Sequence, residues 1–340
     1  MDSVTDDMTF ELPPAVRNTA GEVRKAGFEF EFSGATLNIA AMHVRKVFGG
    51  EHVVHSTFVH SVRGTPFGTF SVEMDTTVLK DKTYEKPLRA IGINPRRWDL
   101  KRLEQAILGT FATVVPAEVA TPPLPVTELA PLDDLRRRLR DSGARGTRAG
   151  LLNAFGLHIN PEIASEDPAY LLAVLRAFVL LYPWLKTRTE VDFARRVSPY
   201  INPFPPDYVR LILAPGYPAT RDRLVDDYLA HNPSRNRPLD MTPVLAFLER
   251  DRVSRRVQER HLVKPRPAFH YRLPNCMVDE PHWTIAREWN TWVAVERLAA
   301  DAARLGELSR EYLRADERSV RPLFDPWPQI VEGYMSGARG

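Results

Sequence analysis

Two glutamates near the start of the chain, Glu29 and Glu31, alternate with three phenylalanines in the stretch GFEFEFS of residues 27–33. A spacing of two residues is the period of a β-strand, in which successive side chains point to opposite faces of the sheet. The pattern therefore predicts a strand that buries its phenylalanines and presents two carboxylates side by side. Taken alone, this alternation is typical of an ordinary antiparallel strand with one face in solvent.

Four later stretches repeat the alternation and place further polar side chains on one face of a strand. These are Ser71, Glu73 and Asp75 in residues 70–75, Glu118 in residues 111–119, His158 and Asn160 in residues 151–160, and His270 and Arg272 in residues 267–273. If the strands share a sheet, acids, histidines and an arginine gather on one surface, where like charges must be neutralised. Oxygen-rich sites of this kind suit Mg²⁺ or Mn²⁺, which are commonly shared with substrate phosphates. The residues thus favour nucleotide-dependent chemistry at a metal centre.

The elements between these strands predict an α+β fold with an antiparallel sheet. Apolar residues at helical spacing predict helices over residues 35–48, 98–108, 127–140, 170–185, 190–197 and 281–316, with several more between residues 206 and 258. We expect residues 1–22 to form a flexible arm and residues 23–316 a catalytic domain with a helical insert at about 167–260. Residues 317–340 are expected to form an irregular strap.

Residues 52–62 predict a single strand that carries three histidines, His52, His55 and His60. Their spacing does not bring all three to one face of a strand, so we expect no metal site there.

Composition argues against several classes of partner. Among 340 residues, 46 Lys and Arg are spread along the chain with 43 Asp and Glu, so we expect no nucleic-acid partner. The absence of a run of 18 apolar residues and of a basic-then-apolar leader argues against a membrane protein. The single cysteine, Cys276, cannot form an internal disulfide. We therefore expect a cytoplasmic location.

Five motifs occur in an order that resembles a known family. They are Gly27-Phe28-Glu29-Phe30-Glu31, Asp75-Thr76-Thr77, Glu118-Val119-Ala120-Thr121-Pro122-Pro123-Leu124, Gly156-Leu157-His158-Ile159-Asn160 and Phe269-His270-Tyr271-Arg272-Leu273. Their order and spacing resemble the putative amidoligases, carboxylate–amine ligases with a glutamine synthetase-like fold that are related to glutamate–cysteine ligases. The resemblance runs from about Gly27 to Leu273 and is weakest in the helical middle.

The resemblance implies both a fold and a reaction. The fold is an antiparallel sheet, backed and covered by helices, whose concave face holds ATP and Mg²⁺ or Mn²⁺. In the reaction, ATP phosphorylates a small-molecule or peptide carboxylate, and an amine then attacks the acyl phosphate to form an amide. A glutamine amidotransferase-like protein is an implied partner.

The resemblance also implies roles for individual residues. The implied metal ligands are Glu29, Glu31, Glu118, His158 and His270, and the catalytic candidates are Arg272, which would stabilise the transferred phosphoryl group, with Glu73 and Asp75. The candidates for nucleotide binding are His158 and Asn160. Two further candidates come from their positions in the chain: Arg196, where a loop could return to the site, and Lys80, which flanks the Glu73 strand.

One position departs from the family pattern. Glutamine synthetase-like enzymes usually offer Glu-x-Arg before the long helix, whereas this chain has His270 in place of the glutamate. Because histidine adds no negative charge, we hypothesise that Glu73 supplies the missing charge. The departure leaves two alternatives open: a catalytically degenerate scaffold that binds nucleotide or metal, and a related phosphotransferase that forms no amide.

Overall fold

The computed structural model describes residues 9–74, 116–147, 155–190, 201–318 and 325–337. Within these residues, nine strands form one sheet in the order β2-β3-β4-β5-β1-β7-β9-β8, with β6 paired to β1. All the strand pairs are antiparallel. The strands are β1 (Lys25–Phe32), β2 (Glu51–Ser56), β3 (Val59–Thr65), β4 (Gly68–Met74), β5 (Ala117–Ala120), β6 (Leu124–Pro125), β7 (Leu157–Pro161), β8 (Leu239–Asp240) and β9 (His270–Tyr271). The α+β class and the antiparallel sheet predicted from the sequence are confirmed.

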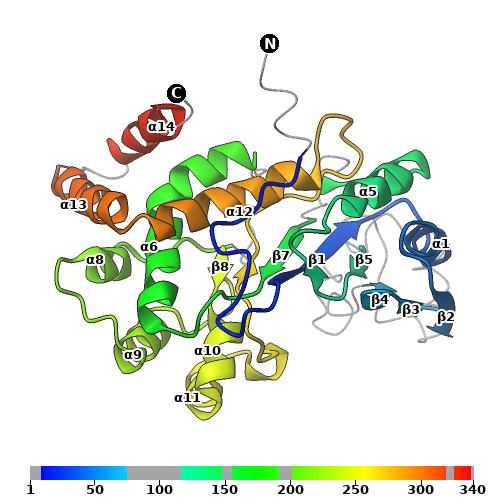
Figure 1. Cartoon of the computed structure of the whole chain (residues 1–340), viewed down its shortest axis with the longest axis horizontal. Coiled ribbons are helices and arrows are strands. Elements are labelled where there is room, and N and C mark those ends of the chain that lie inside the picture. Colours follow the sequence, from blue (N-terminus) through cyan, green and yellow to red (C-terminus); the bar gives the residue numbers. More distant parts are fainter. Residues whose placement is uncertain (1–8, 75–115, 148–154, 191–200, 319–324, 338–340) are drawn as a thin grey trace, which may run out of the picture.

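Helices lie along the sheet and extend beyond it, as Figure 1 shows. They are α1 (Leu37–Phe48), α5 (Pro131–Asp141), α6 (Pro168–Arg188), α8 (Pro206–Leu213), α9 (Arg221–His231), α10 (Thr242–Leu248), α11 (Arg250–Arg256), α12 (Ile285–Ala300), α13 (Ala302–Glu317) and α14 (Trp327–Gly337), with a 3₁₀ turn at Arg260–Leu262. Helix α6 contacts α12, α13 and α14, while α1 contacts α5 and strands β2, β3 and β4.

The central strand β1 is fixed to helix α12 through its apolar face. Phe28 is fully buried, and its ring centroid lies 6.1 Å from that of Trp289. Just before the strand, the buried Arg24 forms an ion pair of 2.7 Å with Glu296 of the same helix. Burying a phenylalanine side chain contributes about 2–3 kcal/mol, so the alternation in β1 anchors the strand and turns its glutamates to the opposite face.

The end of β1 depends on a glycine. Gly34 has a φ of 82°, and a Cβ at this position would approach the carbonyl oxygen of Gly143 to 2.4 Å. Only glycine fits a left-handed conformation with so close a neighbour. The turn lets Ser33 and Arg145 exchange backbone hydrogen bonds of 2.9 and 2.8 Å.

Helix α6 is long and apolar enough to cross a membrane by composition alone, but 61% of its most apolar stretch is buried inside the protein. Arg176 interrupts that stretch and donates a hydrogen bond of 2.5 Å to the carbonyl oxygen of Ile212. Burial of this kind is typical of a core helix in a globular protein.

Three expectations about elements were wrong. Residues 52–62 form two strands of a hairpin, because the chain turns at Thr57 and Phe58. The helix expected over residues 281–316 is broken at Asp301, whose carboxylate accepts a hydrogen bond of 2.9 Å from the backbone N–H of Arg304 and so caps α13. The expected strap contains helix α14, which buries Trp327 and Val331 at helical spacing.

The first part of the chain lies against helix α12. The backbone N–H of Glu11 donates a hydrogen bond of 2.9 Å to Asn290, and the Trp289 indole donates one of 2.8 Å to the carbonyl oxygen of Glu11. The division into an arm, a catalytic domain with its insert and a strap stays a prediction.

Candidate active site on the polar face of the sheet

Three glutamates form a row across neighbouring strands on the polar face. Glu31 of β1 is in register with Glu118 of β5, and Glu118 is in register with Glu73 of β4. Side chains directly opposite one another on antiparallel strands lie with their Cβ atoms about 4.5–5.5 Å apart, and like charges in that position are destabilising. A bound cation would offset this repulsion. We call these three residues the glutamate row.

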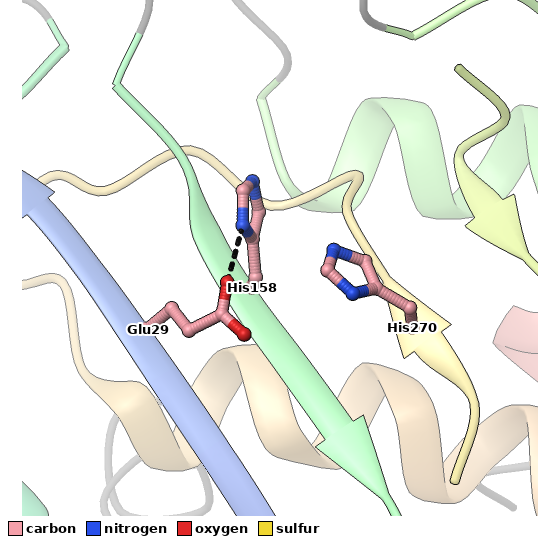
Figure 2. Close-up of side chains that lie close together, drawn as sticks. All are labelled: Glu29, His158 and His270. Carbon is pink, nitrogen blue, oxygen red and sulfur yellow. Dashed lines mark hydrogen bonds and ion pairs between the residues drawn. The ribbon is translucent and has the colours of Figure 1, made fainter. Parts of the chain in front are cut away.

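Glu29 lies one step along β1 from the row and is held by two side chains of β7. The Nδ1 atom of His158 lies 3.0 Å from Oε2 of Glu29 (Figure 2). The amide nitrogen of Asn160 lies 2.9 Å from Oε1. Both carboxylate oxygens therefore accept a hydrogen bond. This follows from the strand register, which pairs Glu29 with His158 and Gly27 with Asn160.

His158 lies between two carboxylates and has a defined hydrogen on its ring. Because the Glu29 carboxylate can only accept, Nδ1 of His158 carries a hydrogen, which leaves Nε2 as the nitrogen of this ring that can bind a metal. Nε2 lies 3.9 Å from Oε1 of Glu31, whose other oxygen accepts a hydrogen bond of 2.7 Å from the backbone N–H of Gly156. A carboxylate that orients a histidine through Nδ1 is a common arrangement behind a metal ligand.

The opposite end of the face is rich in cations. Tyr271 of β9 is in register with Ile159 of β7, so the flanking His270 and Arg272 lie beside Asn160 and His158. An Nη2 atom of Arg266 donates to Oδ1 of Asn160 at 2.6 Å and to Nδ1 of His270 at 2.8 Å. We call His270, Arg266 and Arg272 the cationic cluster.

The cationic cluster is completed by a buried ion pair on and before strand β8. Asp240 is fully buried, is in register with His270, and lies 3.6 Å from the guanidinium of Arg235. Arg272 donates a hydrogen bond of 3.0 Å to the carbonyl oxygen of Arg235. These contacts hold Arg272 against the loop that precedes β8.

Burial and neighbouring charges set the protonation of this site. Burial alone would raise the pKa of Glu29, but the hydrogen bond from His158 and the surrounding basic side chains of His270, His158 and Arg266 outweigh it and hold the pKa well below its ordinary value. Burial lowers the pKa of His270 well below its ordinary value; Glu29 opposes this shift, and Arg272 and Arg266 add to it. Glu29 is thus a carboxylate and His270 a neutral imidazole near pH 7.

The residues of the face suit a divalent cation. Potential ligand atoms of Glu29, His158 and His270 lie within 4.8 Å of one another (Figure 2). Oε1 of Glu31 and Nε2 of His158, 3.9 Å apart, are also close enough to share an ion, since each ligand of Mg²⁺ or a similar ion lies roughly 2.1 Å from it. With the carboxylates of the glutamate row, the donor set is the mixture of oxygen and imidazole nitrogen that Mn²⁺ and Mg²⁺ accept.

Most of the site residues suggested by the sequence lie on one surface. Glu29, His158 and His270 come together, Asn160 joins two of them, Glu31, Glu118 and Glu73 form the glutamate row, and Arg272 lies at the cationic end. Three candidates, Asp75, Lys80 and Arg196, lie outside the described residues. Their roles and those of the other candidates stay predictions.

Sequence reasoning missed Arg266, Arg235 and Asp240. Arg266 is four residues before His270, so extending the alternation of residues 267–273 by one position would have placed both on the same side of the chain. Arg235 and Asp240 lie around a strand of only two residues, which carries no recognisable alternation.

Comparison with known proteins identifies the family. Neither the curated proteins nor the solved structures give a match to the chain. The family described as a putative amidoligase enzyme matches residues 22–294, which is most of the 340-residue chain and includes every residue of the glutamate row and of the cationic cluster. The protein belongs to the putative amidoligase family.

Proposed function

We propose that this protein is an ATP-dependent carboxylate–amine ligase that forms an amide through an acyl phosphate. The observation that carries the proposal is the polar face itself, where a row of glutamates in register lies beside His158, with arginines at the other end. Family membership supports a ligase-type enzyme. The antiparallel sheet, with helix α12 packed against the apolar face of β1, supports the finer inference of a glutamine synthetase-like fold.

The metal end of the site would be formed by the glutamate row, Glu29 and His158. Mg²⁺ or Mn²⁺ bound there would neutralise the phosphate charge and help to orient the phosphate chain. The row is where the chain concentrates its negative charge on this face, and Glu31 and Glu29 are each partly exposed. These side chains can therefore contact a ligand from the solvent side of the sheet.

The reaction would proceed in two balanced steps. A carboxylate oxygen of the substrate attacks the γ-phosphorus of ATP, and ADP leaves. The amine nitrogen then attacks the acyl carbon, inorganic phosphate leaves, and the nitrogen loses a proton. Arg272, fixed by its contacts to the β8 loop, would stabilise the negative charge on the transferred phosphoryl group.

The carboxylate and the amine are best sought with a substrate panel. Purified protein, ATP and Mg²⁺ would be incubated with paired sets of amino acids, short peptides and amines, and ADP, phosphate and amide products would be measured. We expect ADP release that requires both a carboxylate and an amine. ADP release that requires the carboxylate alone would identify the phosphotransferase instead, and a lack of metal-dependent ATP binding by calorimetry would identify the scaffold.

An isotope experiment tests the acyl phosphate directly. With a carboxylate labelled by ¹⁸O on both oxygens, the proposed pathway transfers one ¹⁸O atom to the released phosphate, because the attacking oxygen stays with phosphorus. Phosphate without label, detected by mass spectrometry alongside amide product, would contradict the mechanism.

A further inference from the structure

The hydrogen-bond partner of Nδ1 determines which nitrogen of the His270 ring carries the hydrogen. Its Nδ1 atom lies 2.8 Å from an Nη2 atom of Arg266. A guanidinium stays protonated in proteins and can only donate, so Nδ1 of His270 must accept. A neutral imidazole that accepts at Nδ1 carries its hydrogen on Nε2.

The Nε2 atom of His270 is a buried donor without an acceptor. The residue is 5% exposed, and Nε2 has no hydrogen-bond partner among the residues that the structure describes. A buried donor that is left unpaired destabilises the folded protein, because it loses its hydrogen bond to water and gains none in return. A ligand atom that accepts at this position would remove that destabilisation.

The surroundings of His270 favour an anionic acceptor. Arg266 contacts the ring directly, and Arg272 lies two residues further along the chain. Two carboxylates near the ring already have partners: Asp240 is paired with Arg235, and Glu29 accepts hydrogen bonds from His158 and Asn160. An oxyanion would accept from Nε2 and be attracted by the two arginines. A metal ion would meet the hydrogen of Nε2 and the repulsion of both guanidinium groups.

The two histidines of the face therefore have opposite roles. His158 donates from Nδ1 to Glu29, and its Nε2 lies 3.9 Å from Oε1 of Glu31, where a metal ion could contact both atoms. His270 accepts at Nδ1 and has its hydrogen on Nε2. Figure 2 shows the two rings beside each other, with centroids 5.1 Å apart.

We propose that His270 is not a metal ligand but an oxyanion donor, which gives an Nε2–H hydrogen bond to a phosphoryl or carboxylate oxygen, and that Arg266 is the positioning residue that fixes its tautomer. The identity of the anion as part of ATP or of an acyl phosphate rests on the proposed function; the donor role does not. The change from the glutamate usual in related folds to His270 would then replace a metal ligand by an anion-binding group.

The tautomer can be measured in the full-length protein without any turnover. In protein labelled with ¹⁵N in its histidine rings, the resonances of His270 are assigned by their loss in His270→Gln. We expect a protonated Nε2 and an unprotonated Nδ1 that persist when Mg²⁺ alone is added. A proton on Nδ1 in the free protein, or loss of the Nε2 proton when Mg²⁺ is added, would overturn the proposal.

Anion probes then test the donor role. Inorganic pyrophosphate and acetate are added separately, and a shift of the Nε2–H resonance with either supports the proposal and indicates a phosphoryl or a carboxylate ligand, respectively. If neither anion shifts the Nε2–H resonance, even at saturating concentrations, the donor role of His270 is contradicted. Because neither probe is a nucleotide, a failure here is distinct from a failure to bind ATP.

Substitutions of His270 and Arg266 distinguish an anion donor from a metal ligand through the affinities for pyrophosphate and Mg²⁺. Glutamine can donate from a nitrogen near the position of Nε2, so His270→Gln should keep pyrophosphate affinity within about threefold, whereas His270→Glu should lower it about tenfold or more. Arg266→Met should also lower it about tenfold, with Arg266→Lys closer to the parent because lysine still donates to Nδ1. Tighter Mg²⁺ binding by His270→Glu with unchanged pyrophosphate affinity would support a metal ligand and overturn the proposal. If His270→Glu or an Arg266 variant fails to fold, the tautomer of the parent protein, assigned with His270→Gln, still decides.

Discussion

The two ends of the polar face are built in different ways. The glutamate row lies on β1, β4 and β5, three paired strands of four to eight residues, and the row follows directly from their register. The cationic cluster lies around β8 and β9, strands of two residues each, and depends on Arg266, which lies outside both strands.

The two ends of the face also differ in how their charged side chains are stabilised. The row gathers like charges whose repulsion a cation can offset. In the cationic cluster, Arg266 donates to an amide oxygen and Arg272 to a carbonyl oxygen, and the ion pair of Arg235 with the buried Asp240 lies beside them. Asn160 joins the two ends, since its amide nitrogen donates to Glu29 and its oxygen accepts from Arg266. We therefore expect the row to govern metal affinity and the cationic cluster to govern phosphate affinity and turnover.

The largest expected effect is that of Arg272→Met. Loss of the arginine should lower amide-forming turnover by about 10²–10³, because the charge that develops on the phosphoryl group loses its stabilisation. Mn²⁺ affinity, measured by electron paramagnetic resonance, should be unchanged. An equal loss of Mn²⁺ affinity in a folded variant would show that the two ends do not act separately.

Glu31→Gln should have the next largest effect, at the other end. We expect Mn²⁺ affinity to fall about 10–100-fold, since Oε1 of Glu31 lies 3.9 Å from Nε2 of His158 and glutamine supplies no charge. Pyrophosphate affinity without metal should stay the same. Glu22→Gln, at an exposed position before β1, is the matched control. If Glu31→Gln also lost pyrophosphate binding in the absence of metal, the assignment of metal affinity to the glutamate row and of phosphate affinity to the cationic cluster would be contradicted.

Asn160→Ala tests the connection between the ends. It removes one hydrogen bond from Glu29 and one from Arg266, each to a charged group. We expect Mn²⁺ and pyrophosphate affinities each to fall about tenfold. A change in only one of these affinities would show that Asn160 supports one end alone.

The smallest effect is expected for Glu73→Gln. Glu73 is the exposed member of the glutamate row, and its carboxylate accepts a short hydrogen bond from Ser71. Interactions of exposed charges contribute about 0–1 kcal/mol, so Mn²⁺ affinity should change by less than about fivefold. A larger loss, measured beside Glu31→Gln, would support the hypothesis that Glu73 replaces the charge missing at His270.

The sequence by itself determined the strands with strict alternation and the surface they share. Phe28, Phe30 and Phe32 alternate with Glu29 and Glu31 within the eight-residue strand β1, and a period of two leaves no other way to bury the phenylalanines. The order of five such motifs was enough to identify the family.

Only the tertiary structure decided which atoms meet. Whether Glu31 lies opposite Glu118, or His158 opposite Glu29, depends on a register between strands far apart in the sequence, which no local pattern encodes. The roles of the two histidines depend further on single hydrogen bonds, from His158 to Glu29 and from Arg266 to His270. Residue type and spacing place two imidazoles on one face, but the neighbour of each Nδ1 atom determines which Nε2 can ligate a metal and which can donate to an anion.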